Sequence, residues 1–363
     1  CYIVVSEIAK NKTGKKKIVV ASILAALAMV GSMQSVEATI PEGTATGTDT
    51  FAIGPQSNVN GAFGFAIGNN AKFNGGTLGF AIGVNSEAKS NQSIAIGYLS
   101  KATGRNNGGG GDPALAVGAG ANATAGGATA IGMVANASNT YATAIGKSAA
   151  ASGASSIAIG QNTTATQEKA IAIGDGSQAT DLGTTALGRS SAATGASATA
   201  LGSLASASGT TATAVGMEAS ATGNESVAVG KKASATSERS LAVGTNAKAT
   251  GSTAVAVGSG AGGSGALGFA GSLNSSAGVV NTTRTINYAT TADGANAVAL
   301  GFYANAKNSG VAVGQNALAA TGGVAIGKGV LEDTGNNLAG GVVMGQDSAT
   351  LGPYSLAMGF NAF

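Results

Sequence analysis

A tripeptide of Ala, then Ile, Val or Leu, then Gly recurs along most of the chain. Its glycines are 14 residues apart at every step from Gly118 to Gly258, and they recur less regularly on either side of that stretch. Alternation within a unit predicts a short strand, with Ile171 and Ile173 on one face and Ala172 on the other. Self-similarity at a fixed period is typical of a solenoid, whose repeats are stable only when they stack on one another.

A second short alternating stretch follows each glycine, as in Ala219, Ser220 and Ala221, and a turn residue such as Gly223 follows it. Two short strands and two turns in 14 residues make one coil of a narrow, all-β solenoid, with coils stacked about 4.8 Å apart. Aromatic residues are only 4% of the chain, whereas Gly accounts for 60 of its 363 residues. We therefore expect small side chains, chiefly Ala, to fill the inside of each coil.

If small residues fill the interior, the aliphatic residues of each repeat point outward. A long exposed row of such residues promotes aggregation unless it is buried against a partner. A closed cyclic assembly would bury the row on every subunit, although the repeat itself does not give the number of subunits. The predicted interface comprises Ile157, Ile159, Ile171, Ile173, Val227, Val229, Val255 and Val257.

The N-terminus has the pattern of a secretory signal. Lys15–Lys17 precede an apolar run, Ile18–Val30, and the small-residue site at Val36–Ala38 follows it. We expect residues 1–38 to be removed on export. The whole formal net charge of +3 lies within those residues, so no basic surface remains to bind nucleic acid.

The composition argues against catalysis. The chain has no His, which is the commonest general base and metal ligand, and its one cysteine, Cys1, lies in the expected signal. We predict no catalytic residues, no cofactor and no metal, so the chain is not expected to be an enzyme. An ice-binding or other non-adhesive secreted β-solenoid is the alternative, because Thr143, Thr185 and Thr199 share one repeat position that Ile or Val fills in other coils.

The repeats resemble the head of YadA-like trimeric autotransporter adhesins of Gram-negative bacteria. The match is close at residues 91–100, which read Asn-Gln-Ser-Ile-Ala-Ile-Gly-Tyr-Leu-Ser, and residues 4–10 resemble the extended signal region of large autotransporters. The resemblance implies a left-handed parallel β-roll that assembles as a homotrimer. It also implies a cell-surface protein that binds host extracellular matrix (collagen, fibronectin or laminin) and acts in adhesion, autoagglutination and virulence.

The resemblance further implies ligand-binding positions within the repeat motif. The alternative is that the same residues serve stacking, with the aliphatic pair in the oligomer interface and the glycine in the turn. The implied ligand-binding residues are Ser93, Ile94, Ala95, Ile96, Gly97, Ser100, Ser156 and Ser226.

The repeats divide the expected mature chain into three parts. Residues 39–258 and 301–363 carry head repeats, and residues 259–300 are expected to be a head insert or a neck-like segment, with a longer loop as the alternative. A glycine-rich stretch at 100–113 either decorates a binding face or forms an inert loop. The family implies an outer-membrane anchor beyond a stalk, and we expect neither within these 363 residues.

Overall fold

The computed structural model describes residues 43–105, 113–259, 291–293, 295–332, 340–350 and 354–363. The expected signal peptide, most of the glycine-rich stretch and residues 260–290 of the expected insert lie outside these ranges. The described residues belong to one compact unit, Glu42–Phe363, in which every regular element is a β-strand. Within those ranges the structure contains no helix that could cross a membrane.

The strands form two parallel ladders of twenty strands each within the described residues. The even sheet consists of β2 (Phe51–Ile53), β4 (Ala62–Ile67), β6 (Thr77–Ile82), β8 (Ile94–Ile96), β10 (Leu115–Val117), β12 (Thr129–Ile131), β14 (Thr143–Ile145), β16 (Ile157–Ile159), β18 (Ile171–Ile173), β20 (Thr185–Leu187), β22 (Thr199–Leu201), β24 (Thr213–Val215), β26 (Val227–Val229), β28 (Leu241–Val243), β30 (Val255–Val257), β32 (Val298–Leu300), β34 (Val311–Val313), β36 (Val324–Ile326), β38 (Val342–Met344) and β40 (Leu356–Met358).

The odd sheet consists of β1 (Thr44–Ala45), β3 (Asn58–Val59), β5 (Lys72–Phe73), β7 (Glu87–Ala88), β9 (Lys101–Arg105), β11 (Asn122–Ala125), β13 (Asn136–Ala137), β15 (Ala150–Ala151), β17 (Thr164–Ala165), β19 (Gln178–Ala179), β21 (Ala192–Ala193), β23 (Ser206–Ala207), β25 (Ser220–Ala221), β27 (Ser234–Ala235), β29 (Lys248–Ala249), β31 (Thr291–Asp293), β33 (Asn305–Lys307), β35 (Leu318–Ala319), β37 (Leu331–Glu332) and β39 (Ala349–Thr350).

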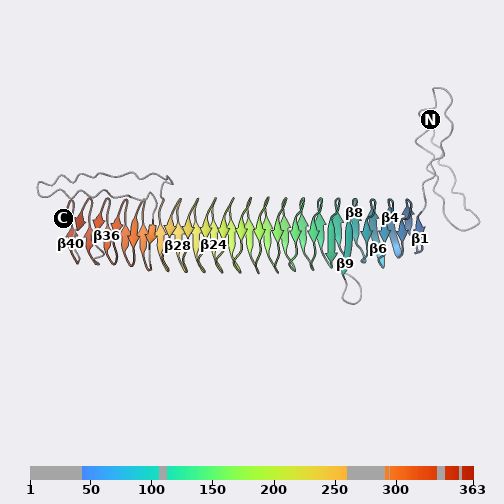
Figure 1. Cartoon of the computed structure of the whole chain (residues 1–363), viewed down its shortest axis with the longest axis horizontal. Coiled ribbons are helices and arrows are strands. Elements are labelled where there is room, and N and C mark those ends of the chain that lie inside the picture. Colours follow the sequence, from blue (N-terminus) through green and yellow to red (C-terminus); the bar gives the residue numbers. More distant parts are fainter. Residues whose placement is uncertain (1–42, 106–112, 260–290, 294, 333–339, 351–353) are drawn as a thin grey trace, which may run out of the picture. The chain divides into compact units, whose positions relative to one another are not determined.

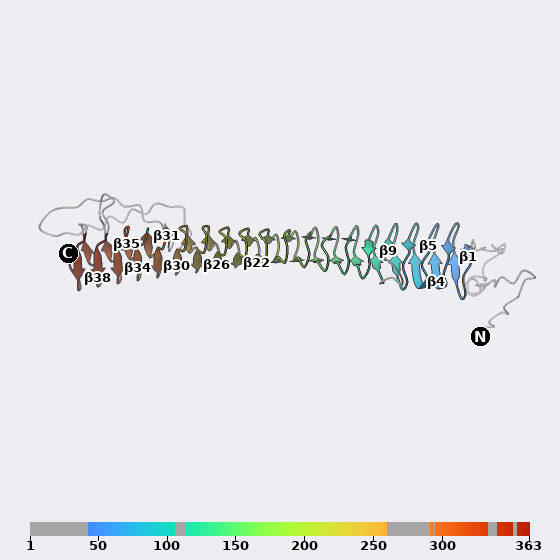
Figure 2. The same cartoon turned by 90° about the horizontal axis from the view of Figure 1, so that it is seen from below.

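Figures 1 and 2 show the strands stacked in sequence order from β1 to β40. Each strand pairs with the corresponding strand of the next coil, so that Ile157 of β16 lies opposite Ile171 of β18 and Ala150 of β15 lies opposite Thr164 of β17. The fold is therefore the all-β parallel β-solenoid that the 14-residue period predicts.

One coil, residues 146–159, illustrates the plan. A tight turn follows Gly146, whose carbonyl accepts a hydrogen bond from the N–H of Ala149 at 3.3 Å. After β15 a second turn is closed by the N–H of Ser156, which donates to the carbonyl of Gly153 at 3.2 Å. We call the line of turns that follow the even strands the first edge, and the line of turns that follow the odd strands the second edge.

The third residue of each turn has a left-handed backbone. Ser148 and Ser155 have φ of 56° and 55°, and their counterparts two coils later, Gly176 and Gly183, have φ of 66° and 63°. For residues other than glycine, this conformation costs roughly 1–2 kcal/mol of conformational free energy. A coil with two such residues is strained on its own, and it depends on its neighbours to offset that strain.

Alanine fills the interior. The central residue of most even strands and the second residue of most odd strands is an Ala with no exposed surface, as at Ala158 and Ala172 in one sheet and Ala151 and Ala165 in the other. Side chains on the two sheets point toward one another, so the space between them admits little more than methyl groups. This confirms the expectation that small residues point inward and the aliphatic residues of the repeat point outward.

The glycines of the repeat form a column in which the backbones of successive coils lie in close contact. Gly174 has a φ of +127°, and a Cβ built on it would lie 2.5 Å from the carbonyl oxygen of Gly188 in the next coil. Both the backbone conformation and the lack of space therefore exclude any other residue. This double constraint explains why the glycine is the most regular feature of the sequence.

The N-terminal coils hold a larger core residue. The ring of Phe73 is fully buried, and it occupies space that glycines leave in β4 and β6. A Cβ on Gly64 or Gly79 would lie 2.2 Å or 2.0 Å from a ring carbon of Phe73. One aromatic ring and two glycines thus replace the alanine packing that other coils use.

Irregular steps in the repeat do not break the ladders. The 21-residue step leaves Ile96 of β8 paired with Val117 of β10, and Lys101 of β9 paired with Asn122 of β11. Across the long interruption, Val257 of β30 pairs directly with Leu300 of β32. Strands β31 and β32 continue the two ladders, so residues 291–293 and 295–300 lie within the solenoid, although the sequence predicts an insert or neck-like segment up to residue 300.

The glycine column can be tested with two alanine substitutions in one turn. Gly174→Ala is expected to cost roughly 2–6 kcal/mol, because backbone strain and overpacking each contribute about 1–3 kcal/mol. The matched control is Gly176→Ala, where the nearest atom is Ser190 Oγ at 3.5 Å and only about 1–2 kcal/mol of left-handed strain arises. Thermal unfolding followed by circular dichroism measures both, and equal midpoints would contradict the close-contact argument.

Candidate functional site

The outward side of the even sheet is an apolar face made of two columns. The last residue of every even strand is Ile, Val, Leu or Met, so one aliphatic column runs unbroken through the twenty strands that the structure describes. Strand pairing keeps this column in register, as for Ile159 opposite Ile173 and Leu187 opposite Leu201. Leu201 retains 40% of its exposed surface in the single protomer. The apolar face is therefore a continuous surface that remains partly exposed to solvent in a single protomer.

The residues two positions before this column form the second column, which is more varied. Phe51, Phe65 and Phe80 pack against one another at its N-terminal end, with ring centroids 6.2 Å and 5.1 Å apart. Farther along, short runs of threonine are interspersed with aliphatic residues, and the longest threonine run covers only Thr185 to Thr213. This group of phenylalanines was not predicted from the sequence. The signal for it is Phe-Ala-Ile-Gly, in which Phe takes the place of the first Ile in Ile-Ala-Ile-Gly. The mixed column gives no continuous threonine array of the kind that ice binding would need.

The structure places all eight expected interface residues on this apolar face. Each is half-buried by its neighbours in the ladder and points away from the alanine interior. These residues are Ile157, Ile159, Ile171, Ile173, Val227, Val229, Val255 and Val257.

The outward side of the odd sheet is a polar face. From β3 to β29 the first residue of each odd strand is Asn, Lys, Glu, Thr, Gln, Ser or Ala. Pairing aligns Lys72, Glu87 and Lys101 in three successive coils, and Glu87 also forms an ion pair with Lys89 at 2.8 Å. The two faces of the solenoid therefore differ sharply in chemistry, one aliphatic and the other hydrophilic.

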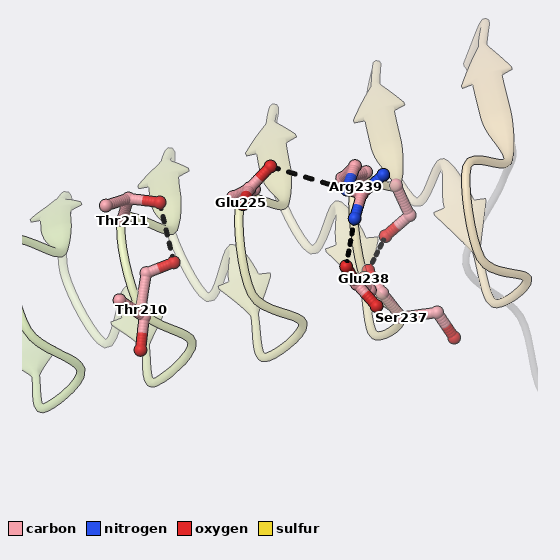
Figure 3. Close-up of polar contacts among 7 residues, drawn as sticks. Thr210, Thr211, Glu225, Ser237, Glu238 and Arg239 are labelled. Atoms are coloured by element: carbon pink, nitrogen blue, oxygen red, sulfur yellow. Dashed lines mark hydrogen bonds and ion pairs between the residues drawn. The ribbon is translucent and has the colours of Figure 1, made fainter.

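Most charged side chains beyond residue 141 lie on the two edges. Figure 3 shows Arg239 between Glu225 of the preceding coil, 3.5 Å away, and Glu238, 2.6 Å away. Lys232 and Glu218 form a similar pair on the first edge at 3.5 Å. Exposed pairs of this kind contribute at most about 1 kcal/mol. No group of three potential metal-ligating residues exists within the described ranges.

The serines implied as ligand contacts point inward instead. Ser93, Ser156 and Ser226 are fully buried, and each hydroxyl donates to a carbonyl three residues earlier, at 2.6–2.7 Å. Ser100 is buried likewise and donates to the carbonyl of Gly97 at 3.0 Å. These hydroxyls close turns within the protomer, so a ligand at the surface cannot reach them.

The remaining residues of that motif divide between the interior and the interface. Ala95 is fully buried, and Gly97 belongs to the glycine column with a φ of +132°. Ile94 and Ile96 lie on the apolar face, in register with Leu115 and Val117 of the next coil. The geometry therefore favours the stacking role for this motif over direct ligand contact.

The inward position of Ser156 predicts how it tolerates substitution. Ser156→Ala is expected to change stability by no more than about 1 kcal/mol, because it removes one hydrogen bond and other coils carry Ala there, as at Ala142. Ser156→Gln is expected to lower the thermal midpoint far more, since the closed interior has no room for the longer chain. A Gln variant as stable as the Ala variant would show that the side chain faces solvent.

The family comparison agrees with this architecture. The model of the YadA head domain repeat matches residues 45–71, 75–106, 110–135, 137–163, 165–191, 193–219, 207–233, 221–247, 235–261 and 288–304, which together are more than half of the chain. A comparison with proteins of curated function found no match. The matched segments follow the coils described above, and the last of them includes β31 and β32 on the far side of the interruption. The chain therefore belongs to the YadA-like trimeric autotransporter adhesins, as a head built of YadA head repeats.

Proposed function

We propose that this chain is the head of a bacterial cell-surface adhesin, which trimerises through its apolar face and binds host ligands with the surface that remains outside. The observation that carries the proposal is the unbroken aliphatic column along the even sheet. A secreted solenoid with such a column exposed would aggregate. Membership of the YadA-like family supports three as the number of subunits.

Trimerisation decides which surfaces meet a ligand. If three even sheets face the assembly axis, the odd sheets and parts of the edges face outward. The outward side chains are mostly small and hydrophilic, such as Ser206, Ser220 and Ser234 in three successive strands of the odd sheet. Such a surface suits weak contacts repeated over many coils, as expected for a long matrix protein.

The ligand class that we propose is host extracellular matrix, namely collagen, fibronectin or laminin, or another host-surface molecule. We further propose a role in adhesion, autoagglutination and virulence, a left-handed roll, and display at the outer membrane of a Gram-negative cell; membership of the YadA-like family supports each of these. Because the implied serines are buried, we place ligand contact on the polar face and the edges rather than on the repeat motif itself.

The trimer is tested by placing charge on the apolar face. The double variant Ile159→Glu and Ile173→Glu is expected to abolish the trimer, because buried carboxylates without partners cost several kcal/mol in each subunit. The matched control, Thr164→Glu and Gln178→Glu, changes the polar face of neighbouring strands and is expected to leave the trimer intact. Sedimentation equilibrium of residues 39–363 measures the mass of each protein.

The same samples then test adhesion on immobilised collagen, fibronectin and laminin. The unchanged trimer establishes the level of binding, and the interface variant is expected to lose binding through loss of avidity. The polar-face variant lies on the proposed ligand surface, so it is a control for assembly alone. A folded monomer in the unchanged protein would overturn the trimer and favour a solitary, non-adhesive solenoid. A stable trimer that binds none of the three matrix proteins would limit the proposal to assembly alone.

A further inference from the structure

Exposed apolar side chains gather on the first edge in the N-terminal part of the solenoid. Backbone hydrogen bonds link these turns coil by coil, with Leu99 N–H donating to Val84 at 3.0 Å and Val134 N–H donating to Ala119 at 2.8 Å. All of the large residues in the group are exposed in the single protomer. The apolar edge patch consists of Val84, Tyr98, Leu99, Ala119, Met133 and Val134.

The patch continues the apolar face without a gap. Each of its turns follows directly after the aliphatic column, so that Ile96 precedes Tyr98 by two residues and Ile131 precedes Met133 in the same way. Gly97 and Gly132 are the only residues between them. In this part of the molecule the apolar surface therefore bends around the first edge instead of ending at the sheet.

The second edge carries matching residues in the same part of the chain. Phe63, Leu78 and Tyr141 occupy the left-handed position two residues before Phe65, Phe80 and Thr143 of the even strands, and all three are exposed. In a cyclic assembly whose even sheets face the axis, the first edge of one subunit meets the second edge of its neighbour. Apolar residues on both edges are complementary in that arrangement.

Charge is distributed in the way that a covered edge requires. Between Phe51 and Tyr141, and leaving aside Arg105 at the end of β9, the charged side chains that the structure describes lie on the polar face; they are Lys72, Glu87, Lys89 and Lys101. From residue 147 to residue 239 the edges do carry charges. These are Lys147, Glu168, Lys169, Asp175, Asp181, Arg189, Glu218, Glu225, Lys231, Lys232, Glu238 and Arg239. Depletion of charge is the compositional mark of an interface core.

We infer that the apolar edge patch is an additional contact with a second copy of this chain, which widens the subunit interface in the N-terminal coils. A second copy fits better than a foreign protein because the patch is continuous with the apolar face and because the exposed side chains of Phe63, Leu78 and Tyr141 lie on the facing edge. This inference rests on the proposed trimer. It adds that the subunits are held over a broader surface before residue 141 than after it.

Two methionines make the contact measurable without changing the protein. Met133 in the patch and Met217 outside it occupy the same position after the repeat glycine, and their exposed fractions in one protomer are similar, 46% and 41%. Residues 39–363 are first confirmed as a trimer by sedimentation equilibrium. The trimer is then treated with hydrogen peroxide, and peptide mass mapping follows sulfoxide formation at each methionine over time.

Met133 is expected to oxidise several-fold more slowly than Met217 in the trimer, and both are expected to react at the same rate in denaturant. Equal rates in the native trimer would overturn the inference while leaving the proposed function standing. A monomer at the first step would instead remove the proposed function. Protection of Met133 only after a matrix protein is added would overturn the second copy as occupant in favour of a foreign ligand.

Matched variants give an independent measurement. Met133→Glu is expected to lower the thermal midpoint of the trimer and raise its dissociation constant several-fold, because it places a charge against the apolar edge of the neighbouring subunit. Met217→Glu occupies the same turn position beside Lys231 and Lys232 and is expected to leave both quantities unchanged. Equal behaviour of the two variants would contradict the wider interface.

Discussion

The structure depends on the close backbone contact between glycines of successive coils. Because a Cβ on Gly174 would meet the carbonyl of Gly188, coil spacing is set by the backbone and its hydrogen bonds rather than by side chains. Each coil whose two turns the structure describes also contains two left-handed turn residues, which cost roughly 1–2 kcal/mol each when they are not glycine. A single coil has no means of offsetting that strain, so the fold exists only as a stack.

The thin interior that results has a consequence for assembly. A buried methyl group such as that of Ala158 stabilises the fold by only about 0.8 kcal/mol, whereas burying an Ile or Val side chain is worth about 1.5–3 kcal/mol. The larger apolar side chains lie on the outer side of the even sheet, where a single protomer buries them only in part. Much of the hydrophobic stabilisation open to this chain is therefore gained on association, and its stability is expected to depend on protein concentration.

Local pattern predicts most of this structure because the repeat is local. Alternation places Ala172 inward and Ile171 and Ile173 outward, and the structure agrees. The same alternation places Ser156 inward beside Ala158, whereas the resemblance to the family implies that Ser156 contacts a ligand. Likewise, residues 297–301 read Ala-Val-Ala-Leu-Gly, which is the repeat motif itself, so the sequence held a signal that the solenoid resumes before residue 301.

Other features depend on residues that are distant in the sequence and could not be predicted from the period. Phe73 is buried only because Gly64 and Gly79, in two different even strands, leave room for its ring. The apolar edge patch exists because turns from Val84 to Val134 stack on one side of the molecule, and no single repeat contains enough of it to be noticed. Such features require the register between coils, which the structure supplies.

The division between fixed and free positions explains how one solenoid can serve many ligands. Stacking fixes the glycine, the inward alanines and the aliphatic column, and it leaves the polar face and both edges free to vary. Insertions obey the same division, since the longer steps between Ile96 and Val117 and between Val257 and Leu300 enter at an edge and leave the pairing intact. Specificity can therefore change along the edges without a cost to stacking. In the N-terminal coils the first edge instead carries the apolar edge patch. The contact that we infer with a neighbouring subunit accounts for this patch.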